Sequence, residues 1–450
     1  MTDLLQDTAE RAARYLAALD DRGVAPSAEA IEALTALDTA LSDTPTDPAE
    51  VLDLLDTYGS PATTATTGGR YYGFVTGGVL PAALAASWMS NTWDQNGFGY
   101  TNSPVAVVLE EISLRWLIDL LGLPSSCGGA FVTGATMANF TALAAARHAV
   151  LERAGWDVEA DGLFGAPNIT VIIGEEAHPT LTKSLGLLGL GRNRVVKVPV
   201  DDQGRMRADA LPAISGPTII CSQAGNVNTG AIDPIGELCD RSHNSNAWVH
   251  VDGAFGLWAQ AAPARKHLTA GIEHADSWAT DAHKWLNVTY DCGLAFVKDP
   301  LSLRAAMAIS AAYLPQTTHR EPMHYTPEAS RRARGIEAWA VLRSLGRQGV
   351  ADLIERNCRL ATRFADQLQQ SGYEIVNDVA LNQVLVSFGS SEHTLSVIKR
   401  IQEEGTCWCG STVWQGKTAM RISVSSWMTT VADVDRSVAA MIQSEKIERG

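Results

Sequence analysis

Two short runs of the sequence combine side chains that could do covalent chemistry. HVDGAFG, which begins at His250, places Asp252 inside an apolar run, and TDAHKW, which begins at Thr280, places Lys284 beside His283. An amine condenses with an aldehyde to form a Schiff base. A buried carboxylate is costly unless a positive group pairs with it. The two runs therefore predict a site in which Lys284 binds an aldehyde and Asp252 faces a cation.

Pyridoxal phosphate is the common aldehyde cofactor of proteins, and its ring nitrogen usually takes an acidic partner. Asp252 has the right chemistry to keep that nitrogen protonated, and each pKa unit of such stabilisation is worth about 1.4 kcal/mol. The alternative for Asp252 is a structural role, because an aspartate at the end of a strand often caps a helix or turn. The alternative for Lys284, a solvated surface lysine, fits poorly with its neighbours His283 and Trp285.

A phosphate needs its own binding site, and FVTGATMANFTALAAAR offers one. The run predicts a strand, a glycine turn and a helix. The backbone N–H groups near Gly134, Ala135 and Thr136 would face an anion at the start of that helix, and the Thr136 hydroxyl could add a hydrogen bond. Many helices begin with such a turn, so it supports a cofactor site only together with Lys284 and Asp252.

The elements that position these residues follow from the pattern between about residues 105 and 300. Short runs rich in Val and Ile alternate there with helical stretches, which is typical of a mostly parallel α/β sheet covered on both faces. Ligands bind beyond the carboxyl ends of the strands in such sheets. His178, Asn226, Asp252 and Lys284 each end or follow a predicted strand. We expect these four polar side chains to converge on one pocket.

The periodicity divides the chain into three parts. Apolar residues have helical spacing before residue 60, and a polar linker rich in Thr and Gly follows. After residue 335, helical runs and strands mix in a way that predicts a smaller α+β domain. We therefore expect an N-terminal helical segment over 1–80, a large α/β cofactor domain over 81–335 and a C-terminal domain over 336–450.

Composition excludes several classes of function. The net charge of −15 argues against nucleic acid or an anionic membrane as a partner. No apolar run reaches about 18 residues, and the acidic N-terminus does not resemble a secretion signal. The seven cysteines do not form a disulfide framework, and Cys407 and Cys409 lack the further ligands of a metal site. We predict a cytoplasmic enzyme without a metal.

HVDGAFG followed by DSWATDAHKWLNVTYDCG resembles the pyridoxal-phosphate-dependent group II amino-acid decarboxylases, which include the aromatic amino-acid, histidine, glutamate and diaminobutyrate enzymes. The resemblance runs from about residue 70 to the C-terminus. The glycine turn before the predicted helix and MRISVSSWMTT near the C-terminus are less specific matches. The resemblance implies the aspartate-aminotransferase fold (fold type I) and decarboxylation of an L-amino acid to an amine and CO2.

The resemblance also implies roles for individual residues. Lys284 looks like the Schiff-base lysine and Asp252 like the partner of the pyridinium nitrogen. His178 resembles the histidine that stacks on the cofactor ring and contacts the substrate carboxylate, and Ala254 would pack on the other face. The implied phosphate ligands are Ala135, Thr136 and His283. Asn226 would lie near the cofactor's 3-oxygen. The chain departs from the family's usual Asn-Pro-His-Lys, because Asp281 replaces the amide.

Pocket residues and a proton donor follow from the same resemblance. The segment GRYYGFVTGG would line the substrate pocket through Phe74, Val75 and Thr76. Family members are homodimers with shared active sites, in which the N-terminal helices wrap the partner; Phe98 would line the pocket of the other subunit. A tyrosine on a mobile loop often returns the proton to Cα, and Tyr325 is the candidate here, with Tyr313 as the alternative.

The substrate is less well defined by the sequence. Apolar pocket walls favour an aromatic or other apolar amino acid over a diacid. Another reaction of the same cofactor remains the alternative: an aminotransferase, a carbon–sulfur lyase or an amine-oxidising aldehyde synthase. A regulator that reuses the fold is a third class, but the acidic helical start does not look like a DNA-binding domain. Arg421 resembles the carboxylate-binding arginine of related aminotransferases, and we expect it to be structural here.

Overall fold

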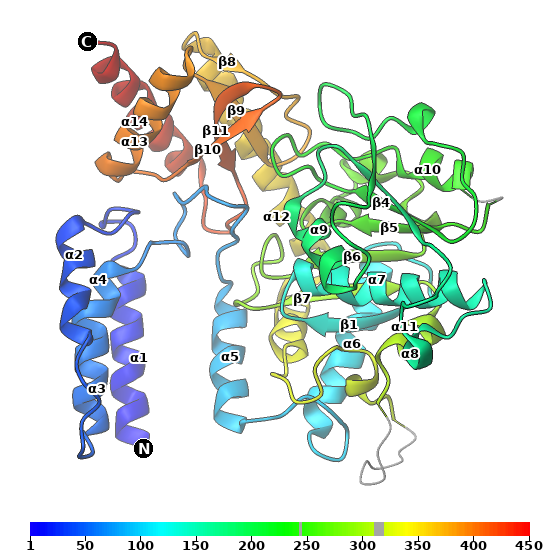
Figure 1. Ribbon diagram of the computed structural model, residues 1–450. Helices are drawn as coiled ribbons and strands as arrows, with labels where there is room; N and C mark the ends of the chain where they lie inside the picture. The colour runs from blue at the N-terminus through cyan, green and yellow to red at the C-terminus, as the bar shows by residue number, and fades with distance from the viewer. Residues whose placement is uncertain (243–244, 310–318) are drawn as a thin grey trace.

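The computed structural model describes residues 1–242, 245–309 and 319–450. A large α/β body carries the central sheet, a smaller domain lies at its upper left, and a helical arm formed by the N-terminus stands beside the body and below the smaller domain (Figure 1). No helix in the described ranges is long and apolar enough to span a membrane.

The central sheet has seven strands in the order β1-β7-β6-β5-β4-β2-β3. Only β7 runs antiparallel to its neighbours β1 and β6, and the other pairs are parallel. The predicted mostly parallel sheet is therefore confirmed. The strand bounds are β1 Gly128–Val132, β2 Thr170–Gly174, β3 Val196–Val198, β4 Thr218–Gln223, β5 Trp248–Asp252, β6 Ser277–Asp281 and β7 Gly293–Val297.

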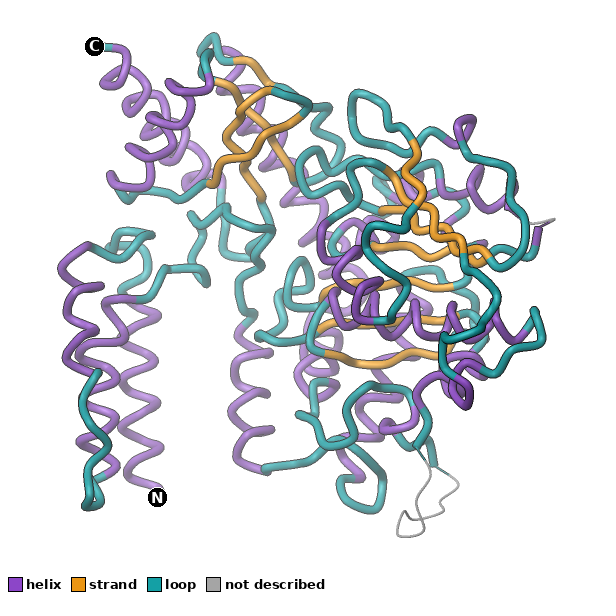
Figure 2. The backbone as a smooth tube through the Cα atoms, in the orientation of Figure 1, coloured by secondary structure: helices purple, strands orange, loops and turns teal. Residues whose placement is uncertain are grey.

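Helices cover both faces of this sheet (Figure 2), and most residues of its strands are therefore buried. One face packs on α7, α9 and α11, and the other packs on α6, α10 and the first part of α12. Side chains alternate between these faces along a strand, so in β5 Val249 and Val251 face one layer and Trp248 faces the other. The helix bounds are α5 Pro81–Trp93, α6 Pro104–Leu120, α7 Ala135–Glu152, α8 Val158–Asp161, α9 Pro179–Leu187, α10 Ile235–Ser242 and α11 Pro300–Met307.

The smaller domain holds an antiparallel sheet in the order β10-β11-β9-β8. Helix α12 leads into it and changes direction at Gly346, where φ is 59°. Residues of α12 up to Cys358 pack into the core of the large domain, and those from Leu360 onward pack into the small one. The helix thus joins the two cores. The remaining bounds are α12 Gly335–Gln370, β8 Glu374–Ile375, β9 Gln383–Ser387, α13 Ser391–Glu404, β10 Gly410–Trp414, β11 Lys417–Ser423 and α14 Val431–Arg449.

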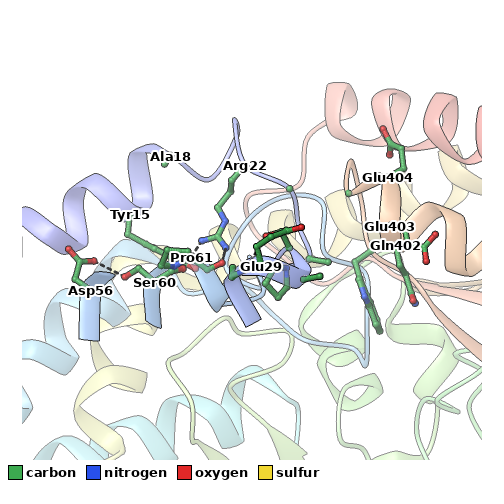
Figure 3. Close-up of a pocket in the computed structure, with 18 of the residues that line it drawn as sticks. Tyr15, Ala18, Arg22, Glu29, Asp56, Ser60, Pro61, Gln402, Glu403 and Glu404 are labelled. Atoms are coloured by element: carbon green, nitrogen blue, oxygen red, sulfur yellow. Dashed lines mark hydrogen bonds between the residues drawn. The ribbon is translucent and has the colours of Figure 1, made fainter. Parts of the chain in front are cut away.

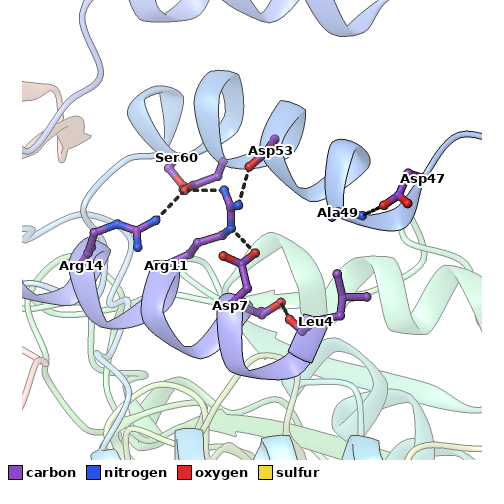
Figure 4. Close-up of polar contacts among 10 residues, drawn as sticks. Leu4, Asp7, Arg11, Arg14, Asp47, Ala49, Asp53 and Ser60 are labelled. Carbon is purple, nitrogen blue, oxygen red and sulfur yellow. Dashed lines mark hydrogen bonds and ion pairs between the residues drawn. The ribbon is translucent and has the colours of Figure 1, made fainter. Parts of the chain in front are cut away.

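The N-terminal arm consists of α1 (Thr2–Ala17), α2 (Ala28–Ala33), α3 (Pro48–Leu54) and α4 (Ser60–Ala62). None of these four helices contains a buried residue. Ion pairs join the helices of the arm: Arg11 of α1 reaches Asp7 and Asp53 (Figure 4). Arg11 also pairs with Asp56. The arm is therefore joined by charge rather than by a core of its own.

Few contacts tie the arm to the rest of the molecule. The Val24 N–H donates to the Gly405 carbonyl at 2.8 Å, and the Arg70 guanidinium donates to the carbonyls of Asp20 and Thr406. An open cavity of about 1040 Å³ lies between the arm and the end of α13, and Figure 3 shows polar side chains from both sides of it.

Candidate active site

A cavity of about 350 Å³ opens at the carboxyl ends of the central strands. Strands β6, β5, β4 and β2 are consecutive and parallel, so their ends meet at one edge of the sheet. The structure brings seven of the predicted site residues together in the lining of this cavity: Ala135, Thr136, His178, Asp252, Ala254, His283 and Lys284.

Asp252 is the last residue of β5 and is 5% exposed. Its carboxylate accepts hydrogen bonds from Asn139 Nδ2 at 3.1 Å and from the Ala254 N–H at 3.3 Å. Both donors are neutral amides, and burial raises the pKa of Asp252 because the charged form loses its hydration. A positive group in the cavity would favour the ionised form of this carboxylate.

A chain of buried hydrogen bonds fixes the amide that donates to Asp252. Asn139 Oδ1 lies 2.8 Å from His250 Nε2, and since an amide oxygen only accepts, His250 carries its proton on Nε2. The Ser277 hydroxyl donates to the other ring nitrogen, Nδ1, at 2.9 Å and accepts from Trp248 Nε1 at 2.8 Å. Burial lowers the pKa of His250 to about 3, so the ring is neutral.

Lys284 follows β6 in a turn that three parts of the chain hold in place. The ammonium of Lys284 lies 3.2 Å from Asp281 Oδ2. A Cβ on Gly77 would lie 1.8 Å from the Lys284 carbonyl oxygen, so this glycine packs directly against the turn. Asn287 is fully buried, and its Oδ1 accepts from the N–H groups of Gly78 and Trp427 at 2.9 Å each. The lysine is therefore positioned by segments far apart in the sequence.

His283 presents one N–H group to the cavity side. Its Nδ1 accepts from the Cys292 N–H at 3.0 Å, so the proton of the neutral ring lies on Nε2. Burial lowers the pKa of His283, which favours this neutral form. The ring lies 4.3 Å from the ring of Tyr290. Burial raises the pKa of Tyr290, and the Thr76 side chain partly opposes this shift, so the predicted pocket residue Thr76 lies near a neighbour of His283.

His178 occupies the N-cap position of α9. Its Nδ1 accepts from the Thr180 N–H at 3.3 Å and lies 2.7 Å from the Thr180 hydroxyl. Burial is the main cause that lowers the pKa of His178. The ring is therefore neutral, with Nε2 as its donor atom, and Thr180 joins it in the cavity lining.

Six predicted residues lie outside the lining of this cavity: Phe74, Val75, Thr76, Phe98, Asn226 and Tyr325. Asn226 is buried, and its Oδ1 accepts from the N–H groups of Asn228 and Thr229, so its side chain stabilises its own turn. Val75 is fully buried in the core of the large domain, and Phe74 is 62% exposed and packs against Trp408. Their roles toward a cofactor or substrate stay predictions.

Phe98 and Tyr325 belong to a second group that this cavity does not contact. The Met323 N–H donates to the Phe98 carbonyl at 3.0 Å, which joins the two predicted segments to each other. The Tyr325 ring lies under the guanidinium of Arg320 at 4.2 Å. Tyr313, the alternative proton donor, lies outside the described residues.

Several residues that form this site were not predicted from the sequence. Asn139 is the single buried amide in an alanine-rich helix one turn after the glycine turn, and that isolation is a signal that could have found it. Gln223 and Thr180 line the cavity but follow no recognisable pattern. Arg421, set aside as structural, has a charge near enough to His178 to lower its pKa further.

The comparisons with known proteins agree with this geometry. The family model described as the pyridoxal-dependent decarboxylase conserved domain matches residues 35–390. The chain belongs to the pyridoxal-dependent decarboxylases. Among its relatives, an aromatic-L-amino-acid decarboxylase of Drosophila lebanonensis is 31% identical over 81% of this chain and 95% of its own length. Tryptophan decarboxylase 1 of Oryza sativa subsp. japonica is 27% identical over 79% of this chain and 76% of its own length.

Solved structures of similar decarboxylases confirm the predicted fold type I architecture. A tryptophan decarboxylase (TDC) of Oryza sativa, crystallised with pyridoxal phosphate and tryptamine, has a TM-score of 0.91 at 22% identity and covers 99% of this chain and 97% of its own. Mouse CSAD has a TM-score of 0.90 at 23% identity, with 98% of each chain covered. The protein is a pyridoxal-phosphate-dependent carboxy-lyase, as the sequence predicts.

The residues of this decarboxylase fit its cofactor. The cavity volume lies within the usual range for small-molecule sites, about 300–1,000 Å³. The cavity contains an amine at Lys284, a buried carboxylate with only neutral donors at Asp252, and a helix N-terminus at Ala135 that can bind a phosphate. Bound pyridoxal phosphate supplies an electron sink for the bond that breaks.

Proposed function

We propose that this decarboxylase converts an aromatic L-amino acid to the corresponding amine and CO2. The main observation behind the proposal is that Lys284, Asp252 and the N-terminus of α7 lie in one cavity. Relatives named tryptophan, tyrosine/DOPA and aromatic-L-amino-acid decarboxylases support the aromatic class. Val227, Ala254 and Phe255 add an apolar surface to the same cavity.

Each cavity residue has a role in this proposal. Lys284 supplies the amine that attaches the cofactor. Asp252, oriented by Asn139, would hold a proton on the ring nitrogen of the cofactor, and the charged ring would supply the electron sink for loss of CO2. His178 is neutral and presents its Nε2–H toward the bound molecules, where a carboxylate would accept it.

The phosphate would be held by neutral donors. The Ala135 N–H begins α7, the Thr136 hydroxyl lies beside it, and the His283 ring offers Nε2–H. A dianionic phosphate binds well at a helix N-terminus because the helix dipole and the free N–H groups both favour it. Ala254 would pack against the cofactor ring opposite His178.

We propose further that the enzyme is a homodimer. Helix α5 exposes Trp88, Met89 and Trp93, which are 42%, 53% and 41% exposed. An apolar cavity of about 410 Å³ lies between α5 and α1 of the arm. Contiguous apolar surface of this kind is typical of a subunit interface, and a second copy of the chain would cover it.

In such a homodimer Phe98 and Tyr325, which lie away from the cavity of their own subunit, would contribute to the cavity of the partner. Because Met323 bonds to Phe98, the two segments would reach the partner's cavity together. Tyr325 is then the proposed donor of the proton that returns to Cα in the partner's site.

Product analysis tests the reaction. Purified protein loaded with pyridoxal phosphate is incubated with Trp, Tyr, DOPA, Phe, Glu and 2,4-diaminobutyrate, and CO2, amine, aldehyde and hydrogen peroxide are measured. We expect equal amounts of amine and CO2, with the highest kcat/KM for an aromatic substrate. Aldehyde with peroxide, or a preference for Glu, would contradict the proposal.

Subunit complementation tests the shared site. Lys284→Ala is expected to be inactive alone and Phe98→Ala to be weakly active. A mixture of the two, re-associated after partial unfolding, should regain about a quarter of wild-type activity, since half of the dimers are mixed and each holds one intact site. Trp88→Glu with Trp93→Glu should give monomers by light scattering, whereas Leu301→Glu, at a 72% exposed position on α11, should not. Failure of the mixture to regain activity would place Phe98 elsewhere.

We also propose a cytoplasmic location. All seven cysteines are buried and unpaired. Burial raises the pKa of the thiols of Cys127 and Cys239, which keeps them protonated and unreactive. A reducing compartment suits such a protein.

A further inference from the structure

The helix end that would receive the phosphate already binds an anion of the protein itself. The Ala135 N–H donates to Asp281 Oδ1 at 2.6 Å, and Asp281 is 2% exposed. Gly134, the N-cap residue of α7, has no side chain with which to cap the helix. Asp281 therefore does for α7 what an N-cap carboxylate does for other helices.

The same carboxylate is surrounded by the other groups that a phosphate would use. Its Oδ2 lies 3.2 Å from Lys284 Nζ, and its Oδ1 lies 3.5 Å from His283 Nε2, the ring nitrogen that carries the proton. Asp281 thus contacts a helix N–H, an imidazole nitrogen and the reactive amine at once. The three groups are those that the proposed function assigns to the cofactor.

The turn that carries the Ala135 N–H is closely packed. A Cβ on Gly134 would lie 3.1 Å from His283 Cε1 and 3.4 Å from Asp281 Oδ1. A Cβ on Gly293 would lie 2.4 Å from Gly134 Cα, so the turn is packed against β7. One N–H group makes one strong hydrogen bond, and a carboxylate and a phosphate repel each other at this distance.

We propose that Asp281 is an internal anion that occupies the phosphate site in the cofactor-free protein and is displaced from the Ala135 N–H when pyridoxal phosphate binds. This inference rests on the proposed cofactor site. The carboxylate stabilises the empty site by capping α7 and by pairing with the Lys284 ammonium. Its negative charge then lowers the affinity of the site for the phosphate. Asp281 would therefore determine how readily the enzyme exchanges its cofactor.

Replacing Asp281 by Asn separates these effects. The amide oxygen can still accept from the Ala135 N–H, but it neither repels a phosphate nor pairs with an ammonium. Pyridoxal, which lacks the phosphate, reports the change at Lys284 alone. The ratio of the dissociation constants of pyridoxal and pyridoxal phosphate therefore measures the contribution of the phosphate. We expect Asp281→Asn to raise this ratio by about tenfold or more.

The experiment is a titration of cofactor-free wild type and Asp281→Asn with both aldehydes, followed by tryptophan fluorescence. The variant should also have a lower Tm without cofactor, and inorganic phosphate should raise that Tm more than it raises the wild-type value. Asp299→Asn is the matched control, because Asp299 caps α11 through the N–H groups of Leu301 and Ser302. It should lower Tm and leave the ratio unchanged.

Two results would overturn the proposal in different ways. An unchanged or smaller ratio in Asp281→Asn, with normal pyridoxal phosphate binding in both proteins, would show that Asp281 does not compete with the phosphate. Absence of pyridoxal phosphate binding in both proteins would remove the cofactor site and this inference with it.

Discussion

Replacing Asn139 by Ala should weaken cofactor binding without touching the cofactor. Asn139 is fully buried and makes two hydrogen bonds, one to the Asp252 carboxylate and one from His250. A hydrogen bond to a charged group contributes about 1.5–3 kcal/mol, and a buried donor left without an acceptor costs about 1–3 kcal/mol. Loss of the bond to Asp252 changes the carboxylate that faces the cofactor. Loss of the bond from His250 lowers the stability of the fold.

The two losses have different readouts. The orphaned His250 N–H lowers the free energy of unfolding of the cofactor-free protein, which a denaturant titration measures. The freed Asp252 carboxylate loses both orientation and stabilisation of its charge, so the dissociation constant of pyridoxal phosphate should rise about tenfold or more. A fluorescence titration measures that constant.

Thr141→Val is the matched control for this variant. Thr141 lies on the same helix and is equally buried, but its hydroxyl donates only to the Met137 carbonyl one turn earlier. We expect a small loss of stability and an unchanged cofactor affinity. If Asn139→Ala destabilises the protein and leaves the affinity within about twofold of wild type, then Asn139 merely fills space and does not position Asp252.

Three further predictions concern neighbouring positions. The free energy of unfolding of His250→Gln should fall less at acid pH than that of wild type. In wild type the folded pKa of His250, about 3, lies below the ordinary 6.5, so the stabilisation is complete above pH 6.5 and wild type loses about 2 kcal/mol more than the variant by pH 5. Denaturant titrations measure this difference, and parallel pH profiles would refute it. Asn287→Ala should unfold more readily than Asn287→Gly by about 1 kcal/mol, because φ is 56° there; equal values would contradict a strained turn. Gly77→Ala should abolish cofactor binding, measured by absorbance, whereas Gly186→Ala, with open space around it, should bind normally.

The sequence predicted the site best where strand ends determine position. Asp252 ends a strand and Lys284 follows the next one, and parallel strands bring their carboxyl ends to one edge whatever the loops do. The glycine turn before α7 is local in the sequence for the same reason. The positions of these residues could be predicted from the sequence because short segments determine their geometry.

Other residues depend on information that a sequence does not carry locally. Asn226 follows a strand, as Asp252 and Lys284 end or follow theirs. Its side chain nevertheless accepts from the N–H groups of its own turn, which asparagine side chains commonly do. The position of Tyr325 depends on Arg320 and on a segment around Phe98, more than two hundred residues away. The link from His250 to Asn139 likewise joins positions 111 residues apart. Only packing of the complete fold sets such contacts.

The most direct test of the central claim is to find which lysine holds the cofactor. The protein is loaded with pyridoxal phosphate, reduced with borohydride, digested and examined by mass spectrometry. One modified peptide is predicted, the one that contains Lys284, with no adduct and no CO2 release in Lys284→Arg. Modification of a different lysine, or decarboxylation by the Arg variant at the wild-type rate, would contradict the account.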